Sequence, residues 1–594
     1  MLTLGGGTAH AASGPSPGVC REEEPVRREV AVESTADAYL ELLVARGIEY
    51  LFGNGGTDFG PLIDAYARRM ATEQPVPKPV TVPHEITAVA MAHGYTMVTG
   101  RPQAVMVHTI AGTANATGGL INASRAHIPM LFTAGRTPIS EGALRGSRDG
   151  SIHWAQESFD QGSMVREWVK WDYELRFGAD LEGVVDRALA IAQADPPGPV
   201  YLTLPREVLA EARERFTYDD RPRMTPGRTV PAPAAVQEAA RLLARARRPL
   251  AVTRSLGKDP AAVTALVRLA ELLGLPVFDA APTHVNFPGD HPLFQPTDIG
   301  PHLPGADVVL VLETDVPWTP KRHQPDPDTT VIAVGQDPLL ARYPVRGFPV
   351  HVALTGAPSL ALAALADAVA AEPPDAATVR ERRAAWATEH ERLRAAARAR
   401  AEAGRGKRPL DKAWVTACLE RVRTEDTIII NELGIDVTQL TLRTPGTFFG
   451  VSTAGVLGWG LGAALGAKLA APAKTVIACV GDGSYMFGVP TAAHWVARRM
   501  NLPVLFLIWN NAQWGAVAGA TRGVYPDGWA VRTGTFPFSD LSPSLDFELV
   551  CRAAGGYGER VEDPEEVPAA LARALHAVQV EGRQALLNLI GAPR

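Results

Sequence analysis

TVIACVGDGSY, residues 475–485, joins an apolar strand pattern to a Gly-Asp-Gly turn. A predicted helix at 491–500 follows, and a second apolar run, VLFLIW at 504–509, ends on an Asn-Asn pair. Strand, helix and strand in this order predict two parallel strands of one α/β sheet. Parallel strands deliver the residues that follow them to the same carboxyl edge, so Asp482 and Asn511 are expected to lie together there.

The residues at this edge suit a metal ion that holds a diphosphate. One carboxylate and one amide oxygen are hard ligands of the kind Mg²⁺ takes when it bridges to a phosphate. Gly481 and Gly483 allow close backbone approach, the helix N-terminus after them favours negative charge, and Ser484 is expected to contact the bound group as well. The alternative is an ordinary turn with two surface asparagines.

The composition limits the classes of function. With 594 residues, the chain is expected to hold three or four domains. A net charge of -6 argues against a nucleic-acid partner or an anionic membrane surface, and no apolar run reaches transmembrane length. Its 4 cysteines form no CxxC pair, which fits a reducing compartment without structural zinc. We therefore expect a cytoplasmic protein.

Alternation of strand and helix patterns continues through the chain. The fold class predicted is α/β, with three doubly wound parallel-sheet domains. Buried-strand candidates include AVMV at 104–107, VVLVL at 308–312 and VIAV at 331–334. The predicted division is a disordered lead-in at 1–33, domains at 34–209, 234–371 and 409–594, and a connecting helix at 373–408.

The Gly-Asp-Gly and Asn-Asn motifs, placed in the last of three α/β blocks, resemble the thiamine diphosphate (ThDP)-dependent decarboxylases and carboligases, in particular their acetolactate synthase-like branch. The resemblance covers nearly the whole chain beyond its first thirty or so residues. It implies successive pyrimidine-binding, middle and diphosphate-binding domains, with ThDP and Mg²⁺ as cofactors. It also implies that the metal is held by Asp482, Asn511 and the carbonyl of Gln513.

A carboxylate in the first block is the candidate for activating that cofactor. Glu85 follows a strand-like TVP and opens a helix of small and apolar residues, with no Lys or Arg beside it in the sequence. Burial disfavours the charged form of a carboxylate, which suits proton relay near neutral pH. The stretch is similar to the HE…GYA…G.P block of acetolactate synthases and benzoylformate decarboxylases, which implies a hydrogen bond from Glu85 to the aminopyrimidine ring. The alternative is a carboxylate that only stabilises a helix start.

The segment STAGVLGWGLGAALGAKLAAP, residues 452–472, resembles the stretch that precedes the Gly-Asp-Gly turn in this family. The resemblance implies that Leu457 bends the cofactor and that the Gly455 carbonyl binds the pyrimidine amine. Leu457 as simple core is the alternative. In the relatives, Glu85 and Asp482 come from different subunits, which implies a homodimer or homotetramer with active sites at the subunit interface.

Two signals bear on the reaction, which uses a small 2-oxo acid. His108, Thr57 and, with an uncertain alignment, His323 resemble active-site positions of benzoylformate decarboxylase, which releases an aldehyde from an aryl 2-oxo acid. The middle block resembles acetolactate synthases, which ligate the decarboxylated fragment to a second carbonyl. The glycine turn and acidic run associated with flavin are missing, so FAD is not expected. We expect carboligation first, decarboxylation as the alternative, and a non-catalytic relative as a third possibility.

Overall fold

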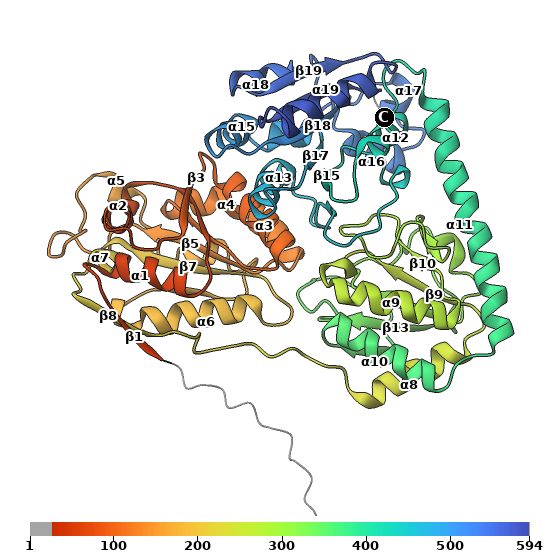
Figure 1. Cartoon of the computed structure of the whole chain (residues 1–594), viewed down its shortest axis with the longest axis horizontal. Coiled ribbons are helices and arrows are strands. Elements are labelled where there is room, and N and C mark those ends of the chain that lie inside the picture. Colours follow the sequence, from red (N-terminus) through yellow and green to blue (C-terminus); the bar gives the residue numbers. More distant parts are fainter. Residues whose placement is uncertain (1–25, 593–594) are drawn as a thin grey trace, which may run out of the picture.

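The computed structural model describes residues 26–592 and contains three lobes, each built on a six-stranded sheet (Figure 1). All pairings within these three sheets are parallel, and helices flank each sheet, so the predicted α/β class with three doubly wound sheets is confirmed. Within residues 26–592, no helix is both long and apolar enough to cross a membrane.

The N-terminal domain has the strand order β3-β2-β4-β5-β7-β6. The predicted strand at 104–107 is confirmed as β4. The domain's elements are β2 (Tyr50–Asn54), β3 (Lys78–Thr81), β4 (Ala104–Val107), β5 (Met130–Arg136), β6 (Asp172–Glu174), β7 (Pro199–Pro205), α1 (Thr35–Ala45), α2 (Gly60–Ala71), α3 (Glu85–Thr99), α4 (Thr109–Arg125), α5 (Ile152–Ala155), α6 (Leu181–Gln193) and α7 (Arg206–Ala210).

A separate two-stranded antiparallel ribbon pairs β1 (Arg27–Ala31) with β8 (Arg215–Asp219). The structure thus corrects the end of the lead-in predicted at 1–33, because residues 27–31 form a strand; its first 25 residues lie outside the described part. The ribbon also extends the first domain beyond the predicted boundary at 209. Backbone pairing with a distant strand supplies the order that the polar sequence of β1 did not suggest.

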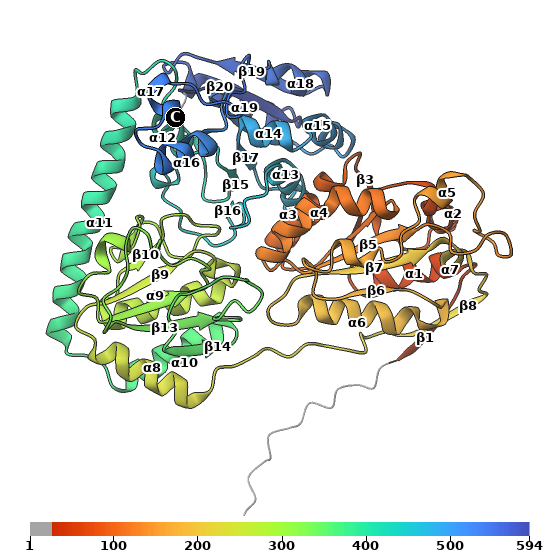
Figure 2. The ribbon, with the colours of Figure 1, turned by 180° about the vertical axis from the view of Figure 1, so that it is seen from behind.

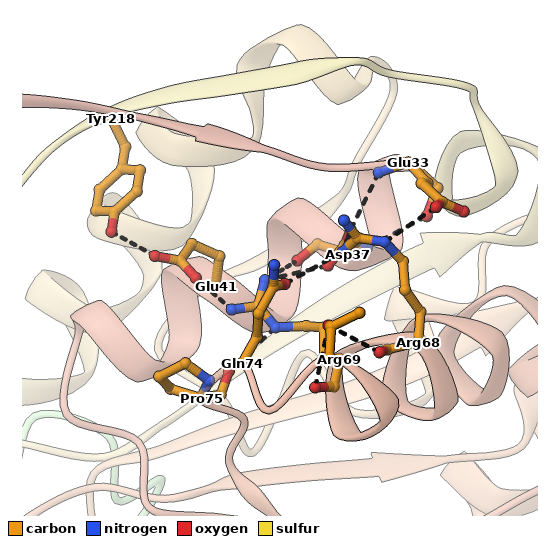
Figure 3. A network of polar contacts seen from close by, with 10 residues as sticks. Glu33, Asp37, Glu41, Arg68, Arg69, Gln74, Pro75 and Tyr218 are labelled. Atoms are coloured by element: carbon orange, nitrogen blue, oxygen red, sulfur yellow. Dashed lines mark hydrogen bonds and ion pairs between the residues drawn. The ribbon is translucent and has the colours of Figure 1, made fainter.

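Buried charges hold this ribbon to the domain (Figure 3). Arg69 donates to Asp37 at 3.0 Å and to Glu41, and Arg68 donates to Asp37 at 2.6 Å. Tyr218 on β8 donates to Glu41 at 2.6 Å. Because each buried charge has an opposite partner, this network can remain in the core, and removing one member would leave the others uncompensated.

The middle domain has the strand order β11-β10-β9-β12-β13-β14, and the C-terminal domain β16-β15-β17-β18-β20-β19. The middle domain contains β9 (Pro249–Thr253), β10 (Val277–Phe278), β11 (Phe294–Gln295), β12 (Val308–Leu312), β13 (Thr330–Gly335), β14 (Val352–Thr355), α8 (Pro233–Arg245), α9 (Pro260–Leu273) and α10 (Pro358–Ala371). The predicted connecting helix is α11 (Ala376–Gly404), which runs along the outside of the middle and C-terminal domains (Figure 2).

The C-terminal domain carries the Gly-Asp-Gly turn between β17 and α14. Its elements are β15 (Ile428–Glu432), β16 (Phe448–Gly450), β17 (Val476–Gly481), β18 (Val504–Asn510), β19 (Tyr557–Val561), β20 (Ala585–Ile590), α12 (Lys412–Val422), α13 (Trp459–Ala470), α14 (Asp482–Phe487), α15 (Pro490–Arg499), α16 (Gly515–Val524), α17 (Trp529–Thr533), α18 (Phe547–Ala553) and α19 (Val567–Gln579). Both strands and the helix predicted around the motif are confirmed.

Helices α3 and α13 join the first and last domains, and they lie side by side in both views (Figures 1 and 2). Glycines make this contact possible: a Cβ on Gly466 would lie 1.9 Å from the carbonyl oxygen of Met91, and one on Gly94 would lie 2.0 Å from that of Ala463. One buried apolar cluster runs through the contact from the first sheet to the third. The start of α3 at Glu85 is therefore fixed relative to the start of α13.

Candidate active site

Three polar residues meet at the carboxyl edge of the N-terminal sheet. Glu85 begins α3 and is 5% exposed; Asn54 ends β2 and Asn115 lies on α4. The Asn54 amide donates to Glu85 Oε1 at 2.8 Å, and the Asn115 amide donates to Oε2 at 3.2 Å. Within residues 26–592, no cationic side chain forms an ion pair with Glu85. Both oxygens are thus held by neutral amide donors, which fix the position of the carboxylate.

His108 lies at the same edge, directly after β4, and pairs with a buried carboxylate. Its Nδ1 is 2.6 Å from Oδ1 of Asp58, which is 2% exposed. This hydrogen bond raises the pKa of His108 above its ordinary value, against the opposing effect of burial. A Cβ at residue 135 would lie 1.7 Å from Asp58 Oδ2, so the carboxylate needs Gly135 beneath it. Because Asp58 holds the Nδ1 proton, proton exchange at His108 occurs at Nε2, which lies 3.3 Å from the Gln156 amide.

Thr57 contacts a second histidine. Its Oγ1 is 3.4 Å from Nε2 of His153, which lies on α5 and is 3% exposed. The Asp149 peptide nitrogen and carboxylate Oδ1 both lie 3.2 Å from His153 Nδ1, and Nε2 of the same ring faces Thr57. His323 lies in the middle domain against Gly300, where a Cβ would meet its ring at 2.5 Å. In this chain, the structure therefore groups His153 rather than His323 with Thr57.

Asp482 is the first residue of α14 and lies against the end of β18. Its Oδ1 accepts from the Gly483 N–H at 2.7 Å, and its Oδ2 accepts from the Asn511 N–H at 3.0 Å. Burial raises the pKa of Asp482, and these peptide donors act in the opposite direction. A Cβ at residue 483 would lie 2.2 Å from the Trp514 ring, whereas one at residue 481 would meet nothing closer than 3.9 Å. A Cβ at residue 481 would thus make only ordinary contacts, with Ser484 and Leu433, whereas one at residue 483 is excluded by Trp514.

The side chain of Asn511 turns one end of its carboxamide toward two oxygens. That end lies 3.3 Å from Asp482 Oδ2 and 3.1 Å from the carbonyl oxygen of Gln513. If the amide nitrogen of Asn511 occupies this end, it donates hydrogen bonds to both oxygens. If the amide oxygen occupies it, the oxygens of Asn511, Asp482 and Gln513 converge on one point. Octahedral Mg²⁺ with bonds of about 2.1 Å places neighbouring ligand oxygens about 3.0 Å apart. The oxygen arrangement therefore fits a magnesium ion.

The loop before α13 carries Gly455 and Leu457 at the edge of this domain. Gly455 is exposed, with a φ of 62°, and Leu457 is half-buried. Asn122 of α4 ties the loop to the N-terminal domain: its amide donates to the Val456 carbonyl at 2.7 Å, and its side-chain oxygen accepts from Ser452 at 2.8 Å. The loop thus contacts the domain that carries Glu85.

Glu432, the last residue of β15, lies beneath the same loop and is completely buried. Its Oε1 accepts from the Gly458 N–H at 2.7 Å, and its Oε2 accepts from the Gly460 N–H at 2.5 Å. Burial raises the pKa of Glu432 to about 7, while these N–H groups and the Ser484 hydroxyl lower it. The carboxylate therefore connects the loop before α13 to the Gly-Asp-Gly turn.

Two clusters result, one on the N-terminal sheet around Glu85 and one on the C-terminal sheet around Asp482. Among the described residues, no hydrogen bond or ion pair joins Glu85 or His108 to Asp482 or Asn511. Sequence reasoning missed several members of the clusters, namely Asn54, Asp58, Asn115, His153, Gln156 and Glu432. Asn54 and Glu432 end parallel strands, so the rule that selected Asp482 would also have selected them.

Comparison with known protein families gives three matches in chain order. A model described as thiamine pyrophosphate enzyme, N-terminal TPP binding domain, matches residues 33–164. The central domain of the same enzymes matches residues 236–365, and their C-terminal TPP binding domain matches residues 433–586. The clusters around Glu85 and Asp482 lie in the first and last of these matches.

Individual relatives span almost the whole chain. A benzoylformate decarboxylase from Pseudomonas aeruginosa is 30% identical over 570 residues, covering 92% of this chain and 97% of the relative. An acetolactate synthase large subunit from Mycobacterium tuberculosis is 27% identical, covering 86% and 88%. The solved structure of a thiamine diphosphate-dependent 4-hydroxybenzoylformate decarboxylase from Rhodococcus jostii superposes with a TM-score of 0.75 at 25% identity, covering 94% of this chain and 99% of the other.

Proposed function

The chain belongs to the thiamine pyrophosphate enzymes, and on this basis we propose that it decarboxylates an aryl-substituted 2-oxo acid without oxidation and releases the aldehyde. The observation that carries this proposal is the pair formed by His108 and Asp58, 2.6 Å apart at the edge that also bears Glu85. A histidine whose pKa is raised holds its proton to higher pH than an ordinary one and can deliver it from Nε2 to a substrate carbon. Proton delivery is the step that ends a simple decarboxylation.

The remaining residues have the following roles in the proposal. Glu85 holds and exchanges a proton at the aminopyrimidine ring, with Asn54 and Asn115 keeping its carboxylate in place. Thiamine diphosphate, when bound, supplies the electron sink for cleavage of the bond between the carboxylate and the carbonyl carbon. Thr57, whose hydroxyl lies 3.4 Å from His153 Nε2, contacts the substrate carboxylate.

Magnesium and the diphosphate are assigned to the C-terminal cluster. Asp482, Asn511 and the Gln513 carbonyl hold the ion, which is supported by the convergence of their oxygens. Gly481, Gly483 and Ser484 face the diphosphate, a role supported by their place at the start of α14, where β17 ends. Gly455 and Leu457 position the two rings of the cofactor.

Carboligation is the second candidate function, and the sequence favoured it first. It is supported by the acetolactate synthase among the relatives, at 27% identity. In that reaction, the group that remains after loss of CO₂ attacks a second carbonyl instead of taking a proton from His108. The two functions therefore differ in whether the reacting carbon first takes a proton from His108 or bonds to a second carbonyl.

We further propose that the active unit is a homodimer in which the Glu85 cluster of one subunit faces the Asp482 cluster of the other. The separation of the two clusters within one chain supports this arrangement. Large apolar side chains exposed in the single chain support it as well: Phe159 in the N-terminal domain, and Trp529 and Phe538 in the C-terminal domain, are at least 75% exposed. Sedimentation of the protein at micromolar concentration tests it, since a monomer that turns over substrate would refute it.

The deciding experiment measures CO₂ and carbon products together. The protein is supplied with ThDP and Mg²⁺ and given benzoylformate or pyruvate, each with and without an acceptor aldehyde. Free benzaldehyde in equal amount to CO₂, with pyruvate inert, is the expected result. Acetolactate or another coupled product from pyruvate would move the assignment to carboligation. Absence of CO₂ from both acids would count against an aryl or short-chain 2-oxo acid as substrate.

A further inference from the structure

A buried carboxylate that the proposed reaction does not use lies beneath the cofactor-bending loop. Glu432 is 0% exposed, and its two oxygens take separate peptide donors, Gly458 N–H at 2.7 Å and Gly460 N–H at 2.5 Å. These donors flank Trp459, the first residue of α13, and immediately follow Leu457. A bidentate contact of this kind fixes the loop in position and in orientation.

The same carboxylate reaches the diphosphate turn. Ser484, two residues beyond Asp482, lies close enough to Glu432 for its hydroxyl to lower the pKa of that carboxyl. Glu432 also ends β15, the strand next to β17, and β17 leads directly into the turn. One side chain therefore contacts both segments that the proposed function assigns to the cofactor.

We propose that Glu432 is a positioning residue that holds the Leu457 loop and the Ser484 turn at a fixed separation, so that the cofactor is bound in its bent, reactive shape. The inference rests on the proposed function, since Leu457 and Ser484 matter to catalysis only if ThDP binds between the two segments.

Energetics favour a positioning role over simple stabilisation. A carboxylate that is fully buried without a cationic partner is costly to ionise, which is the reason that the pKa of Glu432 rises to about 7. A glutamine would have a similar volume and a far lower desolvation cost, but its amide nitrogen would face one of the two peptide N–H groups. Only a group with two acceptor oxygens satisfies both donors at once.

The test compares two isosteric replacements of buried carboxyl groups. Glu432→Gln removes the second acceptor beneath the loop. Asp279→Asn is the matched control, because Asp279 is 4% exposed in the middle domain and accepts a hydrogen bond from Asn286, which lies outside the cofactor segments. For each protein, three quantities are measured: the dissociation constant for ThDP with Mg²⁺ from tryptophan fluorescence, the melting temperature without cofactor, and the rate of CO₂ release at saturating ThDP.

Glu432→Gln is expected to weaken ThDP binding about tenfold, the equivalent of one charge-assisted hydrogen bond, and to slow CO₂ release even at saturating cofactor. Asp279→Asn is expected to lower the melting temperature without changing ThDP affinity. Wild-type affinity and rate in Glu432→Gln would overturn the inference while leaving the proposed function intact. Failure of the wild-type protein to bind ThDP would overturn both.

A second variant keeps the inference testable if Glu432→Gln does not fold. Gly460→Ala places a Cβ 3.0 Å from Glu432 Oε2, which pushes the carboxylate a few tenths of an ångström without removing it. Weaker ThDP binding in Gly460→Ala is expected, with the charge still present. An unchanged dissociation constant in this variant would overturn the positioning role.

Discussion

The contact between α3 and α13 predicts opposite effects for the same substitution at two helical glycines. In Gly466→Ala, the new Cβ would lie 1.9 Å from the Met91 carbonyl oxygen and 2.9 Å from the Tyr95 nitrogen. An ordinary contact needs about 3.5 Å, so the two helices must separate by about 1.5 Å at this point. The atoms involved belong to backbone, and no side chain can rotate away to relieve the overlap.

The expected cost follows from how cores respond to overpacking. Forcing one extra methyl group into a packed contact costs about 1–3 kcal/mol, and an overlap with backbone on a rigid helix belongs at the upper end of this range. Gly183 on α6 is the control, since its Cβ would meet nothing within 4 Å. Gly183→Ala is expected to stabilise by up to about 1 kcal/mol, because alanine favours the helix more than glycine does. The two variants should thus differ by about 3 kcal/mol, with opposite signs.

The assay is thermal unfolding of both variants and the wild-type protein without cofactor. Gly466→Ala should melt several degrees below wild type, and Gly183→Ala at or slightly above it. Because α3 begins at Glu85 and α13 follows Leu457, Gly466→Ala should also weaken ThDP binding, whereas Gly183→Ala should not. A Gly466→Ala variant that melts at the wild-type temperature would refute the claim that this close backbone approach joins the two domains.

The other predictions concern the site. Glu85→Gln should abolish turnover while leaving ThDP binding measurable by fluorescence; unchanged turnover would exclude Glu85 as the group that activates the cofactor. Asp482→Asn should weaken ThDP binding at low Mg²⁺ and recover part of it at high Mg²⁺, and equal magnesium dependence in variant and wild type would argue against a metal ligand. Asp58→Asn should lower the pKa of His108 toward its ordinary value in an NMR titration. The raised pKa of His108 stabilises the folded state fully below a pH of about 6.5, the ordinary pKa of histidine, and this stabilisation is lost as the pH rises through the pKa of the folded protein. Asp58→Asn should therefore destabilise the protein most in acid. An equal loss of stability at every pH would contradict the ion pair.

Much of the fold followed from local patterns. Continuous apolar runs such as VVLVL and VIAV predicted β12 and β13, because strands covered by helices on both faces need apolar side chains on both. The ribbon of β1 and β8 could not be predicted in this way. Its strands lie almost two hundred residues apart and pair through their backbones, so no local pattern announces the partner.

The candidate site, like the fold, could be predicted only in part from local patterns. Asp482, Asn511 and Glu85 could be identified because each stands directly after a strand pattern, and the sheet edge to which such residues go is set by the parallel order alone. Asp58 and His153 could not be assigned, because their partners lie 50 and 96 residues away on other elements. Glu432 ends the apolar strand pattern IIINE, which could have marked it as a residue at the sheet edge. Its role, however, depends on where α13 begins.

Patterns in the sequence were enough to predict three parallel-sheet domains, and to place a candidate diphosphate turn and a candidate activating carboxylate on two of them. Motif spacing and strand periodicity are local properties, so they can be read from neighbouring residues without knowledge of the fold. The tertiary structure alone decided which oxygens of Glu432 meet which peptide groups, which histidine joins Thr57, and that Gly94 and Gly466 bring two helices into backbone contact. These features depend on distances of a few tenths of an ångström between segments far apart in sequence, and close packing of the whole chain sets such distances.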